Sequence, residues 1–282
     1  MKLRKLVKLN GKRSLYNNWG RAVAISLLDS AVFLLFALVE LMLSMIFGTA
    51  PLTNMGNIPL ISIFLTLIVT IGSFLIHEPL NLGILSWYYS ISEGVSEEVI
   101  NIFSVFANVK QYFRAISLEL NIWGRKLIMA FMYFIIPSLL MVVSIKCLDS
   151  GDLYMQGELS YIIGSSGCLF SALTFLFALV FFLIHKQKFF LARYYVVISG
   201  LSPFEAIKKS KHASKNRLGE ILMFKLSFLP LQLSRLLVIP TIYVKPYYEA
   251  SAMIFARVLM EEHYRSTQLV VSENVTEENK EI

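Results

Sequence analysis

The sequence predicts an all-α membrane protein, a polytopic bundle of about six transmembrane helices. Of its 282 residues, 56% are hydrophobic and 16% are charged, and the mean hydropathy is +0.63. Soluble domains of ordinary composition carry about 25% charged residues. The apolar residues are also gathered into long stretches, and a helix of about 20 such residues crosses a bilayer. These two observations make a soluble globular fold the poorer interpretation.

Six apolar stretches are the candidate spans, because a helix satisfies all its backbone hydrogen bonds internally, as the bilayer interior requires. They are Ala22 to Phe47, Ile58 to Leu80, Leu127 to Ile145, Tyr161 to His185, Ile221 to Ile242 and Tyr247 to Met260. The sixth stretch is the shortest and contains Glu249 and Arg257. It therefore also fits a tilted or interfacial helix.

Basic residues alternate between successive connections. The N-terminal arm, residues 1–21, is rich in lysine and arginine, whereas the loop after the first stretch has neither. The second and fourth connections are basic and the third is acidic. Because lysine and arginine of short loops stay in the cytoplasm, we expect both termini there. The net charge of +7 then indicates attraction to anionic membrane lipids rather than to nucleic acid.

A hexapeptide occurs almost unchanged at two places, as NNWGRA at residues 17–22 and NIWGRK at residues 121–126. A weaker copy stands at residues 215–219, before the fifth stretch. Tryptophan favours the membrane interface, asparagine can cap a helix, and glycine permits close packing. The predicted interfacial motif consists of Asn17, Trp19, Gly20, Asn121, Trp123 and Gly124.

A second pattern also recurs. Tyr88-Tyr89 followed by Gly94 resembles Tyr194-Tyr195 followed by Gly200, and an amphipathic segment follows each glycine. The later segment has a capping-box spacing from Ser202 and a proline at its first helical position. We expect these segments to be helices on the inner membrane surface.

Together the patterns predict three parallel two-helix repeats within a membrane domain. The repeats cover about 17–113, 121–213 and 216–265, the membrane domain covers 22–265, and residues 266–282 are an expected disordered cytoplasmic tail. The alternative is a chance recurrence of interfacial motifs.

Four segments carry a resemblance to a known family: the N-x-W-G entries, PLNLG at 79–83, GLSPFEAIKKS at 200–210, and PYY at 246–248. They resemble the bacterial integral membrane family catalogued as domain of unknown function nine-seven-five. That family is similar to the membrane portion of some glycerophosphodiester phosphodiesterases, whose catalysis belongs to a separate soluble domain. The resemblance implies a module of the bacterial cell membrane that accompanies an activity. Residues 181–192 lack the proline and glycine break usual in the family.

Motifs of catalysis are absent from the sequence. It has no GxGxxG, P-loop, HExxH or GxSxG pattern, and the string His77-Glu78-Pro79 lacks the second histidine of a zinc motif. We therefore expect no enzymatic activity, cofactor or metal. The two cysteines, Cys147 and Cys168, are expected to be packing residues rather than a disulfide.

Polar residues inside the apolar stretches are the remaining site candidates, because ionisable groups in a bilayer are costly and usually face a bundle interior or water. The intramembrane candidates are Asp29, Glu40, Thr66, Thr70, His77, Gln232 and Arg235. One interpretation is an ion pair between Glu40 and Arg235 that holds the bundle together. The other is a polar pathway for an ion or small solute.

The sequence favours a scaffold or accessory membrane subunit without enzymatic activity. Its expected partners are anionic membrane lipids and a membrane protein, and its basic inner-surface helices would contact them. The alternative is a transporter or exporter of a small amphiphile, lipid or peptide, which would use the intramembrane polar face. A membrane-embedded enzyme is the least favoured class, because no nucleophile, metal set or paired acid and base is recognisable.

Overall fold

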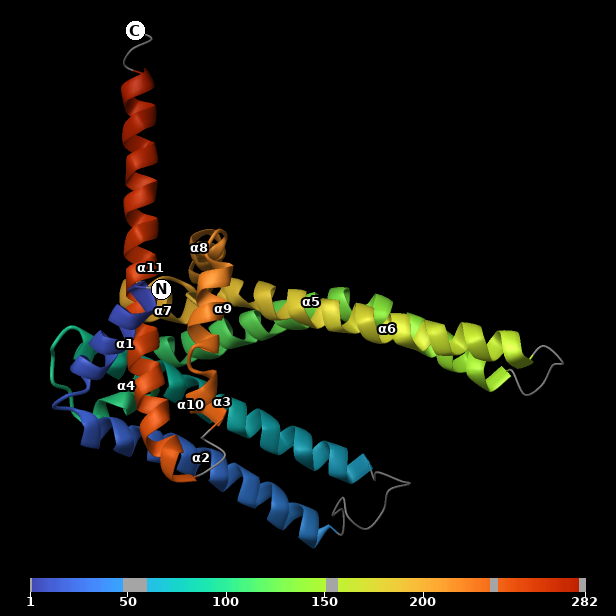
Figure 1. The fold of residues 1–282 in the computed structure, drawn as a ribbon. Helices are drawn as coiled ribbons and strands as arrows, with labels where there is room; N and C mark the ends of the chain where they lie inside the picture. Colours follow the sequence, from blue (N-terminus) through green and yellow to red (C-terminus); the bar gives the residue numbers. More distant parts are fainter. Residues whose placement is uncertain (1, 48–59, 151–156, 234–237, 279–282) are drawn as a thin grey trace.

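The computed structural model describes residues 2–47, 60–150, 157–233 and 238–278, and every regular element within these ranges is a helix. Figure 1 shows two long hairpins that leave a common centre, with α11 running across their bases. The elements are α1 (Lys2–Ser14), α2 (Trp19–Ile46), α3 (Leu60–Ser92), η1 (Val99–Phe103), α4 (Ser104–Ala107), α5 (Val109–Ser150), α6 (Gly157–His185), η2 (Lys186–Phe189), α7 (Ala192–Ser199), α8 (Pro203–Ser214), α9 (Leu218–Leu226), α10 (Leu229–Leu233) and α11 (Val238–Glu278). The predicted all-α class is confirmed for these residues.

The two hairpins contain the first four predicted spans. Four segments are long and apolar enough to cross a bilayer: α2, α3, Val109–Asp149 of α5, and Ser160–Ser199, which begins in α6. Their mean hydropathies lie between 2.3 and 2.5. Large apolar side chains such as Phe33, Leu60 and Met132 are exposed on them. Such surfaces need a covering of lipid, so the chain is a membrane protein with four candidate spans.

The fifth and sixth predicted spans have a different form. The fifth is divided among α9, α10 and the start of α11, and residues 234–237 lie outside the described ranges. The sixth belongs to the middle of α11, where Ala252, Met253 and Phe255 are buried by protein. A helix that is apolar on most sides packs equally well inside a core. The count of six and the threefold repeat therefore stay predictions.

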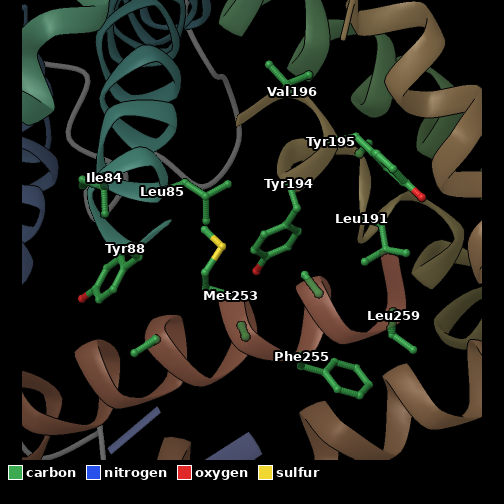
Figure 2. Close-up of a cluster of buried hydrophobic side chains, with 14 of the residues drawn as sticks. Ile84, Leu85, Tyr88, Leu191, Tyr194, Tyr195, Val196, Met253, Phe255 and Leu259 are labelled. Atoms are coloured by element: carbon green, nitrogen blue, oxygen red, sulfur yellow. The ribbon is translucent and has the colours of Figure 1, made fainter. Parts of the chain in front are cut away.

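The hydrophobic core lies at the bases of the hairpins, in a region we call the hub. It comprises α1, residues 79–107, 115–122, 187–228 and 244–260. Figure 2 shows part of the hub, where side chains of α3 and α7 meet α11. The labelled residues are Ile84, Leu85, Tyr88, Leu191, Tyr194, Tyr195, Val196, Met253, Phe255 and Leu259. The ring of Phe224 stacks on that of Phe255, with centroids 4.4 Å apart.

The two hexapeptides occupy different local structures. Asn18 precedes α2 without a side-chain capping bond, and Trp19 packs near Tyr243 with ring centroids 6.3 Å apart. The second hexapeptide lies inside α5, because this helix begins earlier, where Asn108 Oδ1 accepts the backbone N–H groups of Lys110 and Gln111. No glycine or proline interrupts residues 109–123. The expected cap at Asn121 is therefore wrong.

The glycines of the hexapeptides also differ from expectation. A Cβ added at Gly20 or Gly124 would meet no atom within 4 Å, so neither glycine permits a close approach. In contrast, Gly94 and Gly200 have positive φ angles of 81° and 60° and follow the ends of α3 and α7. The second recurring pattern thus corresponds to one shared backbone conformation.

The amphipathic segment after Gly200 folds as predicted. Ser202 is the N-cap of α8, and a capping box joins it to Glu205, whose carboxylate lies 2.9 Å from the Ser202 hydroxyl. Pro203 occupies the first turn. The local sequence was sufficient here because every group in a capping box lies within four residues.

Both chain ends are helical within the described residues. The basic N-terminal arm forms α1, whose Val7 is buried and whose Gly11 lies against Ser251 of α11. At the other end, α11 continues through residues 266–278, where the sequence predicts a disordered tail. No glycine or proline follows Pro246, so nothing in the backbone chemistry stops the helix.

Pro79 leaves one backbone carbonyl near the base of α3 without its helical donor. It lies inside the helix and has no N–H to donate to the carbonyl of Leu75, one turn earlier. The Tyr112 hydroxyl donates to that carbonyl at 3.2 Å. This contact joins α3 to the first turn of α5.

Gly83 provides the tightest contact of a glycine with backbone in the described residues. A Cβ there would lie 2.0 Å from the carbonyl oxygen of Ile102 in η1. Because that atom belongs to the backbone, we expect Gly83→Ala to lower the free energy of unfolding by about 3 kcal/mol. Equilibrium unfolding in mixed micelles, followed by circular dichroism, measures the change.

Gly124→Ala is the matched control, since the new methyl group meets open space. In a helix interior this change is expected to be neutral or stabilising by up to about 1 kcal/mol. Equal stability of the two variants would contradict the close packing of α3 on η1.

Candidate functional site

Charged side chains from five helices meet where the hairpins join the hub. We call this cluster the charged junction. It consists of Asp29 of α2, His77 and Glu78 of α3, Glu119 of α5, Arg193 of α7 and Lys245 of α11. Buried charges are tolerated when they are paired and hydrogen-bonded. The junction pairs its charges in two groups of contacts, although Asp29 Oδ1 and Glu78 Oε2 accept no hydrogen bond from the described residues.

Asp29 is the centre of the first group and is only 6% exposed. The Lys245 ammonium donates to its Oδ2 atom, and His77 Nε2 lies 3.2 Å from its Oδ1 atom. The Asn81 amide nitrogen is 2.9 Å from the other ring nitrogen of His77. Because an amide nitrogen can only donate, Nδ1 of His77 accepts, and the imidazole carries a proton on Nε2, which faces Asp29. One carboxylate thus joins α2, α3 and α11.

Arg193 is the centre of the second group. Its guanidinium makes a two-pronged contact with Glu119, with Nε donating to one carboxylate oxygen and a terminal nitrogen 2.7 Å from the other. The same group lies 3.6 Å from the Glu78 carboxylate. Paired hydrogen bonds of this kind fix both partners in orientation. Because Glu78 belongs to α3 and Glu119 to α5, Arg193 joins the two hairpins.

A small enclosed space separates the two groups. A cavity of about 80 Å³ is lined by Asp29, Asn81, Arg193, Lys245 and Glu249, among others. A polar cavity of this size has room for a few water molecules. The arrangement can hold charges apart and pass protons between water and side chains, but it has no room for a metabolite. Among the described residues, no three His, Cys, Asp or Glu side chains gather to hold a metal ion.

The structure brings together two of the intramembrane candidates, Asp29 and His77. Glu40, Thr66 and Thr70 are exposed on the α2–α3 hairpin, away from the junction, and Gln232 is half-buried in α10. Arg235 lies outside the described residues, and so does its predicted pairing with Glu40. Among the described residues, Cys147 and Cys168 form no disulfide, as expected.

Sequence reasoning missed four residues of the junction: Glu78, Glu119, Arg193 and Lys245. Glu78 and Lys245 stand near the ends of predicted spans, and Glu119 and Arg193 stand in the connections, where charges are ordinarily assigned to water. One signal was present at Arg193, which is the only charged residue in the otherwise apolar and aromatic run of residues 189–198. A lone arginine in such a run indicates a buried partner.

We predict that the Glu119–Arg193 contact is needed for stability. Glu119→Gln leaves the buried end of the guanidinium with a weaker partner, so the free energy of unfolding is expected to fall by about 2–3 kcal/mol. The double variant Glu119→Gln/Arg193→Gln should lose less than the sum of the two single variants. Unfolding in mixed micelles gives all the values.

The exposed pair of Arg217 and Glu220, with nitrogen and oxygen 3.0 Å apart, is the control. Glu220→Gln is expected to change stability by less than about 1 kcal/mol, since water screens this pair. If Glu119→Gln is as mild as the control, the junction does not hold the hairpins together.

Comparison with known proteins adds no identification. No family model matches the chain, and no curated protein and no solved structure matches it significantly. The family resemblance carried by the sequence motifs therefore stays an expectation.

Proposed function

We propose that the protein is a non-enzymatic membrane scaffold or accessory subunit, which docks a partner at the inner face of a bacterial cell membrane. The observation that supports this proposal is that the charged side chains of the junction pair with one another across helices. Each ion pair described there joins one helix to another, and Arg193 bridges the two hairpins. Charged groups that are committed to holding elements together are typical of a structural role.

The size of the junction cavity supports the same proposal. Sites for small molecules usually enclose about 300–1,000 Å³. The cavity between Asp29 and Arg193 has about 80 Å³. The junction therefore favours a firm connection between membrane hairpins and hub over a site that turns over a substrate.

The proposed docking surface is α8 with its basic surroundings. If the four spans cross the membrane with the hub in the cytoplasm, α1 and α8 lie on the inner side, as the basic residues favour. Phe204 in the first turn of α8 is 65% exposed, and the Arg125 guanidinium lies 5.5 Å from its ring centroid. Exposed aromatic and arginine side chains are those that most often dominate protein interfaces.

We predict that Phe204→Ser abolishes capture of a protein partner. The full chain is released from its own membrane in mild detergent, and native mass spectrometry records proteins bound at a fixed ratio. Loss of a buried aromatic contact of this kind typically costs at least about 2 kcal/mol of binding, roughly a thirtyfold weakening.

Tyr16→Ser is the matched control, because Tyr16 is 81% exposed in the connection between α1 and α2, which is separate from α8. The control should retain the partner at the wild-type ratio. Absence of any partner at a fixed ratio, or equal retention by both variants, would refute docking at α8.

The charged lining of the junction cavity, unlike its size, fits a second candidate, the transport or export of a small amphiphile, lipid or peptide. Its lining by Asp29 and Lys245 provides charged groups at the bases of the spans. In the described conformation the space admits only water, so such a solute requires the hairpins to move apart. Solute flux through vesicles that contain the protein tests this candidate. Flux that is lost in a folded Asp29→Asn variant would put transport first.

A further inference from the structure

A groove lies between α8 and α11, apart from the charged junction. It is made of two adjoining cavities of about 630 and 570 Å³, which share Lys209, His263 and Thr267 in their walls. Figure 1 shows α8 beside α11 on the upper side of the hub, whereas the α2–α3 hairpin leaves from the lower side. We call this feature the α8–α11 groove. Its volume is in the range of known ligand sites.

The groove has an apolar floor and a basic rim. Tyr89, Tyr195, Ile198 and Met260 contribute apolar surface from three helices. The basic side chains that line it are Lys208 and Lys209 of α8 and Arg257 and Arg265 of α11. This combination suits a ligand that is anionic at one end and apolar at the other.

The positive charges of the rim exceed their negative partners. Arg257 pairs with Glu93 at 2.5 Å, and the Glu205 carboxylate accepts from Ser202 in the capping box. Lys209 and Arg265 form no ion pair with any residue that the structure describes. The walls carry four cations against the carboxylates of Glu205 and Glu261, and Glu93 outside the walls neutralises Arg257, so the groove keeps one positive charge in excess.

His263 lies in the same excess of positive charge. Burial lowers the pKa of its imidazole, and the neighbouring His212 and Lys209 lower the pKa further. Added positive charge is thus unfavourable within the groove, whereas an anion in contact with these side chains is favourable.

We propose that the α8–α11 groove binds the phosphate head group of an anionic phospholipid, which Lys209 and Arg265 contact while the apolar floor covers its glycerol and upper acyl carbons. The hub must lie at the membrane interface because four apolar spans begin from it. Lipid phosphates are therefore within reach, and basic pockets beside spanning helices are known lipid sites. The inference deepens the proposed scaffold function, on which it rests, by naming a ligand of its docking side.

The test compares retention of two lipids by the full-length chain. Purified protein in detergent receives equal amounts of phosphatidylglycerol and phosphatidylcholine, and native mass spectrometry measures the ratio of bound lipids. The wild type is expected to prefer phosphatidylglycerol. In Lys209→Gln/Arg265→Gln the preference should fall about fivefold for each removed charge. Circular dichroism verifies that the variant is folded.

Lys12→Gln/Lys110→Gln is the matched control, since both lysines are exposed, lie outside the groove and remove the same net charge. It should keep the preference within about twofold, because diffuse surface charge is screened. An equal fall in the control, or no fall in the groove variant, overturns the proposal. Displacement of the lipid by millimolar free glycerol phosphate also overturns it, and assigns the groove to a soluble phosphate ester.

The same preparations separate this inference from the scaffold function. Loss of lipid preference with the protein partner still bound confirms the groove independently of docking through Phe204. If the Phe204→Ser variant loses the protein partner and the wild type shows no lipid preference, the proposed lipid site in the groove is overturned and the scaffold function is not.

Discussion

The cost of burying charge at the edge of a bilayer is the constraint on which this structure depends. Arg193 reaches both Glu119 and Glu78, and these carboxylates belong to different hairpins. An ionised group taken out of water is tolerated only with partners in good geometry. The hairpins can therefore diverge at their outer ends, but their bases are fixed relative to each other. The same contacts position α7, and the pairing of Lys245 with Asp29 positions α11.

The location of the core explains why a protein with four candidate spans needs so much helix outside them. Hydrophobic side chains of α2, α3, α5 and α6 mainly meet lipid, and association of such helices gains little from the hydrophobic effect. Most buried side chains of the described residues belong to the hub, where Trp87 and Phe255 are almost completely buried. The hub thus supplies the tertiary stability that the exposed hairpins lack. Small residues assist the hairpin of α5 and α6, where a Cβ at Gly164 would meet Leu148.

Features determined by neighbouring residues could be predicted from the sequence. Length and hydropathy located the four spans of the hairpins, and the spacing from Ser202 to Glu205 located the start of α8. Composition could not show whether residues 247–260 are surrounded by lipid or by protein, because both present apolar surface. The second hexapeptide also could not identify a helix start, because the helix that contains it begins earlier and is capped by Asn108.

The junction was predictable only in part, for a related reason. Asp29 and His77 stand inside apolar stretches, where any polar residue attracts notice, but their partners stand at the edges. Contacts such as Arg193 with Glu119 join residues 74 positions apart, and local patterns carry no record of such distances. The groove between α8 and α11 was missed likewise, because its basic residues are ordinary in their own segments and unusual only together.

Asp29 and Lys245 are 216 positions apart, so the ribosome makes Asp29 well before its partner. Ribosomes add about 5–20 residues each second, so Asp29 exists for roughly 10–40 s before its lysine is made. During that interval the first hairpin enters the membrane with an acidic group near its base. His77 is synthesised only 48 positions after Asp29 and contacts the same carboxylate. The histidine can thus act as a provisional partner for Asp29 until the final helix arrives to complete the hub.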